Sequence, residues 1–379
     1  MSPARESGWE SIPAMVAATV AEHGDRIAIV EGESRLSYAE LAEEARRFGA
    51  SSVALGVGPG DRVAIWAPNC AEWIVAALGT WAAGAVVVPV NSRFKGGEAA
   101  DVLRRSSARM LVTVTDLLGS DLVALLAGSG VELPDLETIV VVQGRVSEGA
   151  LGWAELLGRA TTEHATELDR RALAVGADDA SDILFTSGTT GTPKGVVQTH
   201  GRTLAVAGDW PAMTGLRAGD RYLMVNPYFH MFGLKAGILA SVSVGATMYP
   251  EAVFDAERAM ATVAAEAITV LPGAPTLYRA LLDHPARSGH DLSSLRIAVT
   301  GAADIPVELV RRIFAELPFS VVVTGYGLTE AGTAASTRPG DDPEAIATTV
   351  GRPRPGFEVR ILDHDGVVVP DGQPGEIVL

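Results

Sequence analysis

The stretch that most constrains this chain is residues 186–195, which read TSGTTGTPKG. Apolar runs of strand length flank it, at residues 182–185 and 196–199, so it is predicted to be the tip of a β-hairpin. Glycines let backbone N–H groups turn toward one point, hydroxyls add donors, and a lysine supplies one positive charge, a combination that binds a phosphate chain. The candidate phosphate-binding residues are Thr186, Ser187, Gly188, Thr189, Thr190, Gly191 and Lys194.

This stretch differs from the common phosphate loop G-x-x-x-x-G-K-[ST]. Pro193 stands where that pattern requires its second glycine, and Gly195 follows Lys194. Because no helix is predicted to begin at the lysine, a helix dipole beneath the phosphates is not invoked. The alternative interpretation is an ordinary Gly/Thr-rich turn between two strands.

Short apolar strands alternate with helices along most of the chain, which predicts an α/β fold with mostly parallel sheets covered by helices. One pattern occurs twice, in residues 63–89 and 222–250: a strand ending at proline, a helix stopped by glycine, and a second strand ending at proline. This repetition can mean two related βαβ units, and the alternative is two ordinary βαβ units that are unrelated to each other. Other predicted elements are a helix from residue 37, capped by Ser37, to residue 52, helices 72–83, 117–126 and 233–244, and strands 269–271 and 320–324.

We interpret this pattern as two related βα subdomains packed in layers, at about residues 1–180 and 181–337. From residue 338 to 379 the chain changes to short strands punctuated by glycine and proline, which predicts the start of a small, incomplete β-barrel.

Composition narrows the classes of partner. The formal net charge is −16 and the pI about 4.9, so the surface repels nucleic acid and anionic lipid, and neither is expected as a partner. The single cysteine, Cys70, excludes an internal disulfide and fits a reducing compartment, and the N-terminus lacks the apolar core of a signal peptide. We therefore expect a cytoplasmic protein; a homodimer is compatible with the sequence.

Two further stretches are predicted to lie at the carboxyl ends of strands, where ligands bind in open α/β sheets. Residues 325–330 read GYGLTE, in which the ring of Tyr326 can stack on a purine, and a hydroxyl beside a carboxylate can hold a phosphate oxygen and Mg²⁺. Taken alone, a tyrosine in a glycine turn is more often a packing residue. Small residues at 300–303 let a flat base approach the main chain. The candidates are Thr300, Gly301, Ala302, Ala303, Gly325, Tyr326, Gly327, Thr329 and Glu330.

A third stretch, residues 226–233, places His230 among aromatic side chains. Such a histidine is more often a hydrogen-bonded core residue than a catalyst. Its setting, P-x-x-H-x-x-G, resembles that of a histidine that lines the carboxylate pocket of adenylate-forming enzymes, which implies that His230 orients an acid. Because such an acid is ionised at pH 7 and needs no general base, His230 is not expected to remove a proton. The candidate walls of the acid pocket are Tyr228, Phe232, Lys235, Gly273 and Thr300.

The motifs T-S-G-T-T-G-x-P-K-G, G-Y-G-x-T-E and P-x-x-H-x-x-G together resemble those of the adenylate-forming enzymes: acyl-CoA ligases, peptide-synthetase adenylation domains and luciferases. The chain looks closest to actinobacterial acyl-CoA ligases, among them those that activate bicyclic propanoates of sterol degradation. The resemblance implies that Tyr326 covers adenine, that Thr329 contacts phosphate and that Glu330 binds Mg²⁺. It also implies that Gly301 belongs to the adenine loop and that His230 lines the carboxylate pocket. ATP, Mg²⁺, CoA and a small carboxylic acid are the implied ligands.

Relatives continue into a C-terminal domain, which supplies a lysine for adenylation and admits the thiol. We expect this domain to be absent here, so that ATP binds weakly and CoA transfer does not occur. Two other readings stay open. One is an adenylating enzyme with another acceptor or acid, either a carrier-protein ligase or a relative that activates nitrous acid. The other is a nucleotide-binding module without turnover.

Overall fold

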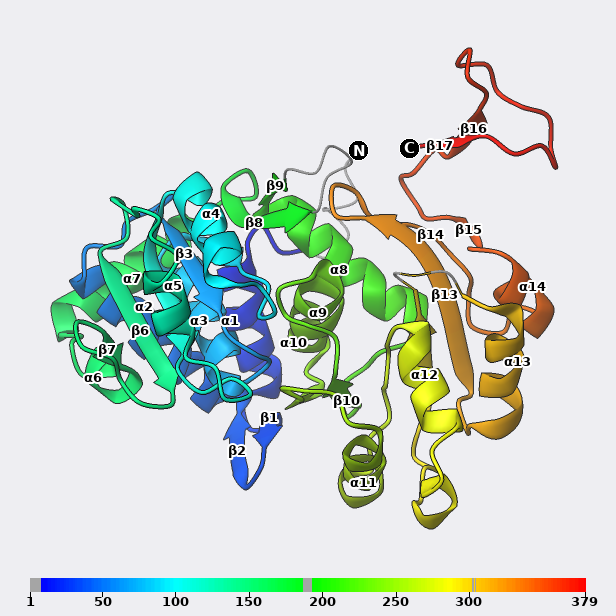
Figure 1. Cartoon of the computed structure of the whole chain (residues 1–379), viewed down its shortest axis with the longest axis horizontal. Coiled ribbons are helices and arrows are strands. Elements are labelled where there is room, and N and C mark those ends of the chain that lie inside the picture. Colours follow the sequence, from blue (N-terminus) through cyan, green and yellow to red (C-terminus); the bar gives the residue numbers. More distant parts are fainter. Residues whose placement is uncertain (1–7, 187–192, 302, 304) are drawn as a thin grey trace.

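The computed structural model describes residues 8–186, 193–301, 303 and 305–379. Over these residues the chain is a mixed α/β protein in which helices cover parallel-rich sheets, as predicted (Figure 1). No helix in the described part of the chain is long and apolar enough to cross a membrane.

The largest sheet has seven strands in the order β7-β6-β5-β3-β4-β8-β9. All neighbours pair in parallel except β8 and β9, which form an antiparallel hairpin at one edge. The chain moves from β3 to β4 in one direction and back past β3 to β5, so right-handed crossovers place α3 and α4 on opposite faces. The strands are β3 (Arg62–Trp66), β4 (Val86–Pro89), β5 (Ala108–Val114), β6 (Thr138–Gln143), β7 (Leu151–Gly152), β8 (Ala180–Thr186) and β9 (Lys194–Thr199).

Two four-stranded sheets follow, in the orders β10-β11-β1-β2 and β12-β13-β14-β15. Val270 joins them, because it forms one bridge to Tyr222 of β10 and one to Ile297 of β12. The predicted strand 269–271 is therefore reduced to a single bridging residue. The strands are β1 (Ile27–Glu31), β2 (Ser34–Ser37), β10 (Arg221–Met224), β11 (Thr247–Pro250), β12 (Ile297–Thr300), β13 (Val321–Leu328), β14 (Gly332–Ser336) and β15 (Arg352–Pro353).

Helices form where capping residues and apolar periodicity coincide. Ser37 and Glu40 form the predicted capping box at the start of α2. The predicted helix 117–126 is wrong over its first half, because Leu117 instead bridges Ser120 around Leu118, whose φ is +53°, and α5 begins only at Leu122. The helices are α1 (Ile12–His23), α2 (Tyr38–Ala54), α3 (Ala71–Ala82), α4 (Gly96–Ser106), α5 (Leu122–Ala127), α6 (Trp153–Leu157), α7 (Thr162–Ala174), α8 (His200–Thr214), α9 (Met231–Gly233), η2 (Leu234–Leu239), α10 (Ala240–Val244), α11 (Ala256–Glu266), α12 (Pro275–Leu282), η3 (Arg287–Gly289), α13 (Val307–Glu316) and α14 (Pro343–Thr348).

The repeated βαβ pattern is present in the structure. β3 and β4 pair in parallel around α3, and β10 and β11 pair in parallel around a helical segment. Gly84 and Gly245 end the two helical segments with φ of +74° and +71°, a conformation that glycine adopts without strain. The second segment differs from the predicted helix 233–244 in its middle, where residues 234–239 form the π-helix η2.

The sheets exchange strands across residue 180, near which the sequence analysis placed a subdomain boundary. β8 and β9 complete the seven-stranded sheet, whereas β1 pairs with β11 and β2 pairs with β1. The main hydrophobic core likewise contains buried residues from both halves, such as Trp73 and Tyr222. The hairpin β8–β9 is consequently held by the first sheet while α8, which follows it, runs toward β13 (Figure 1).

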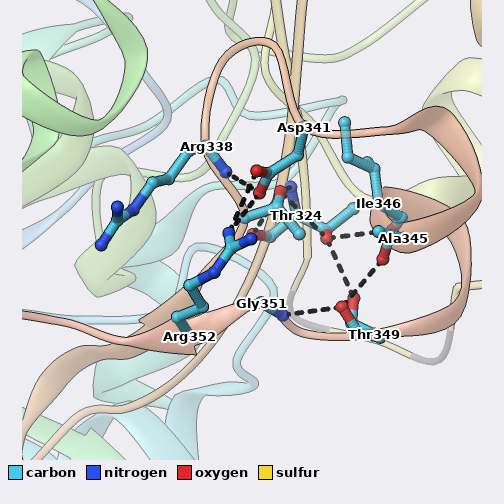
Figure 2. A network of polar contacts seen from close by, with 9 residues as sticks. Thr324, Arg338, Asp341, Ala345, Ile346, Thr349, Gly351 and Arg352 are labelled. Carbon is cyan, nitrogen blue, oxygen red and sulfur yellow. Dashed lines mark hydrogen bonds and ion pairs between the residues drawn. The ribbon is translucent and has the colours of Figure 1, made fainter.

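The C-terminal region combines α14 with a small antiparallel sheet of β16 (Arg360–Leu362) and β17 (Glu376–Val378), which stands out from the body of the protein (Figure 1). The incomplete β-barrel stays a prediction. Figure 2 shows how the preceding segment is fastened to β13: the Thr324 hydroxyl donates to the carbonyls of Ile346 and Thr349. Thr324 is fully buried, so this network fixes β13 directly before its site residues.

His200, the first residue of α8, gives the fold a pH dependence. Its Nδ1 accepts a hydrogen bond from the Ile12 amide (3.3 Å), and burial lowers its pKa from 6.5 to about 4. The unfolded chain therefore binds a proton below pH 6.5 that the folded protein excludes until about pH 4. We expect the contribution of this histidine to the free energy of unfolding to be fully present above pH 6.5 and to fall by about 3 kcal/mol as the pH is lowered to 4.

We expect His200→Asn to remove this component, since an amide oxygen can replace Nδ1 as the acceptor but does not titrate. Denaturant unfolding of both proteins between pH 7.5 and 4 measures it. The variant is expected to lose less stability on acidification than the wild type. Equal losses would show that His200 takes up its proton normally in the folded state.

Candidate active site

A cavity of about 240 Å³ collects eight of the predicted site residues. It lies among β13, the end of β12, α8 and the segment that begins at His230. The predicted residues in its lining are His230, Phe232, Thr300, Gly301, Gly325, Tyr326, Gly327 and Thr329. The sequence analysis missed three wall residues from α8, namely Val206, Trp210 and Met213, because an apolar helix face is the same whether it lines a pocket or a core.

Residues 325–328 do not form the predicted loop. The strand predicted to end at Thr324 continues as β13 to Leu328 and pairs with β14, with a register shift between Tyr326 and Gly327. A Cβ on Gly327 would lie 2.4 Å from the Gly332 carbonyl oxygen, so the glycine serves a close approach of two strands. The strand thereby holds the Tyr326 ring at the cavity wall more rigidly than a loop would.

The turn after β13 carries Thr329 and the exposed Glu330, and it is hydrogen-bonded to the β8–β9 hairpin, the predicted phosphate-binding hairpin. The side-chain amide of Gln198 in β9 donates to the carbonyls of Thr329 (3.1 Å) and Glu330 (3.2 Å). Gln198 is buried, so its two bonds fix the distance between the hairpin and this turn. Nothing in its sequence context distinguished Gln198 from the other strand residues.

The hairpin prediction holds for the described residues. β8 and β9 pair antiparallel up to Thr186 and Lys194, which face each other at the last register position. Lys194 is exposed at the start of β9. The predicted residues Ser187, Gly188, Thr189, Thr190 and Gly191 lie outside the described part of the chain, as does Ala302; Ala303 is exposed beside the cavity residue Gly301.

Arg105, at the end of α4, holds the base of the hairpin. Its guanidinium donates to the Pro193 carbonyl (2.6 Å) and lies over the Phe185 ring, 5.4 Å from the centroid. It therefore contacts both sides of the hairpin, at Phe185 of β8 and at Pro193, the residue directly before Lys194. The sequence alone does not single out Arg105, because only the fold brings α4 next to β8 and β9.

We expect Arg105→Ala to raise the KM for ATP roughly tenfold through the loss of a charge-assisted hydrogen bond, with a smaller change in kcat. The KM for ATP of Arg105→Lys should lie between those of wild type and Arg105→Ala, since lysine keeps the charge but does not stack on Phe185 as a planar group does. Arg104→Ala is the matched control, because Arg104 is the neighbouring arginine of α4 and pairs with Asp101 of the same helix. Equal KM values for the Arg104 and Arg105 variants would contradict this role.

His230 caps the short helix α9 and faces the cavity. Its Nδ1 accepts a hydrogen bond from the Phe232 amide (3.1 Å), and partial desolvation lowers its pKa. At pH 7 the ring is thus neutral with its proton on Nε2. That N–H can donate to a carboxylate oxygen, which fits an orienting role better than proton removal.

Three predicted walls of the acid pocket lie elsewhere. Tyr228 is buried in the core with its ring edge against Trp73. Lys235 is 1 % exposed and forms an ion pair with Asp182. Gly273 bridges Thr300 and does not line the cavity. Their assignment to the acid pocket therefore stays a prediction, and the lining of this cavity does not include them.

A second, larger cavity of about 700 Å³ lies at the carboxyl ends of β3, β4, β10 and β11. Asn69, Arg93, Phe94 and Asn226 are among its lining residues, and of the predicted segment 226–233 it takes Asn226, Pro227 and Phe229. It contains none of the candidate phosphate-, adenine- or metal-binding residues in the described part of the chain.

The acidic side chains near the cavity fit a metal ion that is bound mainly by the phosphates of a substrate. Among the described residues, no group of three or more His, Cys, Asp or Glu side chains converges on one point. Mg²⁺ is usually held by one or two carboxylates, waters and substrate phosphates, so the exposed Glu330 alone is a sufficient protein ligand.

Comparisons with known proteins show which family the chain resembles. The family described as AMP-binding enzyme matches residues 16–379. A 3-[(3aS,4S,7aS)-7a-methyl-1,5-dioxo-octahydro-1H-inden-4-yl]propanoyl:CoA ligase of Rhodococcus jostii is 44% identical over 94% of this chain and 70% of its own length. The ligase of the same name from Mycobacterium tuberculosis is 46% identical over 95% of this chain and 70% of its own length.

Solved structures show the same fold. The anthranilate CoA ligase AuaEII in complex with anthranoyl-AMP superposes with a TM-score of 0.88 at 26% identity, covering 97% of this chain and 69% of that one. The inhibitor-bound N-terminal domain of FACL13 from Mycobacterium tuberculosis gives 0.83 at 28% identity, covering 97% and 88%. The chain therefore belongs to the AMP-binding enzyme family, and it is an AMP-forming ligase of the acyl-CoA synthetase type.

Proposed function

We propose that this chain binds ATP and a carboxylic acid in the 240 Å³ cavity and at the β8–β9 hairpin, and joins them into an acyl-adenylate with release of pyrophosphate. The acyl group then passes to CoA. One observation carries the proposal: Gln198 of the hairpin strand binds the Thr329–Glu330 turn, while Thr329 lines the same cavity as His230. Phosphate-binding and acid-binding groups thus share one site.

The chemistry explains this arrangement. A carboxylate is a poor electrophile and must be activated before another group can attack it. One of its oxygens attacks the α-phosphorus of ATP, and the bond between that phosphorus and pyrophosphate breaks. The protein contributes mainly position and charge neutralisation. The Nε2–H of His230 orients the carboxylate, the Tyr326 ring covers adenine, and the Thr329 hydroxyl binds the α-phosphate. Lys194 binds the departing pyrophosphate.

Glu330 is the proposed Mg²⁺ ligand. A bound Mg²⁺ would neutralise charge that develops on the phosphate oxygens. Glu330 is well suited to hold it because Gln198 fixes the turn from which its carboxylate extends into solvent, beside the cavity residue Thr329.

We further propose that the acid carries a bulky alicyclic tail, as in the propanoate named for the two relatives from Rhodococcus jostii and Mycobacterium tuberculosis. The cavity walls Val206, Trp210, Met213 and Phe232 are apolar, and Trp210 meets Phe232 edge to face with 5.4 Å between centroids. Such walls bind a rigid ring system by burial of apolar surface.

Exchange of labelled pyrophosphate into ATP tests both proposals, because it requires the adenylate but not CoA. The alicyclic propanoate is expected to support exchange with a kcat/KM at least about tenfold above anthranilate or an aliphatic acid of similar size. Faster exchange with anthranilate would contradict the acid class. Exchange with nitrite alone would favour the diazotising alternative, and ATP binding without any exchange would favour a binding module.

A further inference from the structure

A buried ion pair lies behind the acid-binding cavity. The Lys235 ammonium is 3.2 Å from the Asp182 carboxylate, and their side chains are 1 % and 0 % exposed. Asp182 belongs to β8, the strand that enters the phosphate hairpin. Lys235 belongs to the π-helix η2, which follows the segment of His230 and Phe232.

Two hydroxyl groups form hydrogen bonds with the pair. Lys235 donates to the Thr203 hydroxyl (2.9 Å), which donates in turn to the second Asp182 oxygen (2.8 Å). The Ser181 hydroxyl donates to that same oxygen (2.7 Å). Thr203 lies on α8, so the cluster joins β8, α8 and η2 at one point.

The same elements build the cavity. α8 continues from Thr203 to the wall residues Val206, Trp210 and Met213, and Ala236, directly after Lys235, is also in the wall. The ring contact between Trp210 and Phe232 spans the two elements at the cavity itself. A shift of η2 relative to α8 would therefore change the cavity's shape.

Stability alone does not account for such a pair. Removing two charges from water is costly, and an apolar pair of similar size commonly serves a core equally well. A hydrogen-bonded ion pair is directional, unlike apolar packing, so it holds its two partners in one relative position. π-Helical turns, which widen a helix locally, are frequent at functional sites.

We propose that the Asp182–Lys235 pair is a positioning device that sets the acid-binding walls on α8 and η2 relative to the phosphate hairpin. This inference rests on the proposed function, since it assigns the cavity to the acid. Neither side chain lines the cavity, so both are positioning residues and not catalytic ones.

The test uses the double variant Asp182→Asn/Lys235→Met, which removes both charges, keeps the side-chain volumes and retains an acceptor for Ser181 and Thr203. Pyrophosphate exchange is expected to show a KM for the acid raised roughly tenfold, a KM for ATP within about twofold of wild type, and weaker discrimination between alicyclic and planar acids. The matched control is Asp220→Asn/Arg296→Met, an ion pair with a buried carboxylate outside both cavity linings. A double variant with wild-type KM values and selectivity would overturn the proposal.

If the double variant does not fold, the variant Thr203→Val tests the positioning role instead. It deletes the bridging hydroxyl without a change of volume, and the KM for the acid should rise about threefold and return to wild type in Thr203→Ser. A KM that stays unchanged in Thr203→Val would overturn the proposal.

Hydrogen exchange separates failure of this inference from failure of the proposed function. If wild-type protein activates no acid, the proposed function fails, but amides in residues 203–214 and 231–240 should still exchange faster in the variants than in wild type, without global destabilisation. Unchanged exchange in both segments would overturn the positioning role whatever the activity.

Discussion

Glu330→Gln is expected to reduce Mg²⁺-dependent pyrophosphate release by at least about 1,000-fold, because a metal ion's charge stabilisation is worth several kcal/mol and the amide is a weak ligand. Glu330 is exposed in the turn after β13, so the substitution leaves the Gln198 bonds to the main chain in place. The melting temperature should therefore not change. A Mg²⁺ titration of exchange should show an apparent Kd shifted to much higher concentration.

Glu43→Gln provides the control, since Glu43 is also exposed but lies on α2, away from the cavity lining. It should match wild type in both rate and Mg²⁺ dependence. A Glu330 variant with the same Mg²⁺ dependence as wild type would remove this residue from the metal site. If neither wild type nor variant released pyrophosphate while both bound ATP, the chain would be a binding module.

Lys194→Met is expected to lower exchange roughly 100- to 1,000-fold, the effect of removing one donor that stabilises developing charge. Lys194 begins β9 opposite Thr186, at the last pair of the hairpin, and its exposed side chain is free to follow the leaving pyrophosphate. The loss should appear in kcat more than in the KM for the acid, because the acid binds at the cavity and not at the hairpin.

Lys194→Arg separates charge from shape. A guanidinium retains the positive charge and binds phosphate in a forked geometry, so part of the activity should return. If Lys194→Met and Lys194→Arg both kept wild-type activity, Lys194 would have no role in charge neutralisation. If only the KM for the acid rose, the lysine would belong to the acid site.

The elements that the sequence predicted well are those with local signals. Ser37 and Glu40 fixed the start of α2 through a capping box, and the prolines and glycines of the two βαβ units marked strand and helix ends. The cavity residues around Tyr326 and His230 were found because polar or glycine-rich groups follow strand ends, where open α/β sheets bind ligands.

The errors concern contacts between distant segments. Tyr326 lies on a strand because β14 is available as a partner, which residues 325–328 alone do not reveal. Lys235 was predicted to line the acid pocket, whereas in the structure it forms a buried ion pair with Asp182, which is far away in sequence. Gln198 and Arg105 were missed for the same reason: their partners come from other elements.

A crystal structure with Mg²⁺·ATP and a non-hydrolysable acyl-adenylate analogue, each soaked separately, tests the central claim most directly. The account predicts adenine against Tyr326 and Gly301, the acyl group against the apolar wall that Trp210 and Phe232 form, and the triphosphate between Lys194 and Glu330. Nucleotide in the 700 Å³ cavity beside Asn69 and Phe94, with the β8–β9 hairpin free of phosphate, would contradict it.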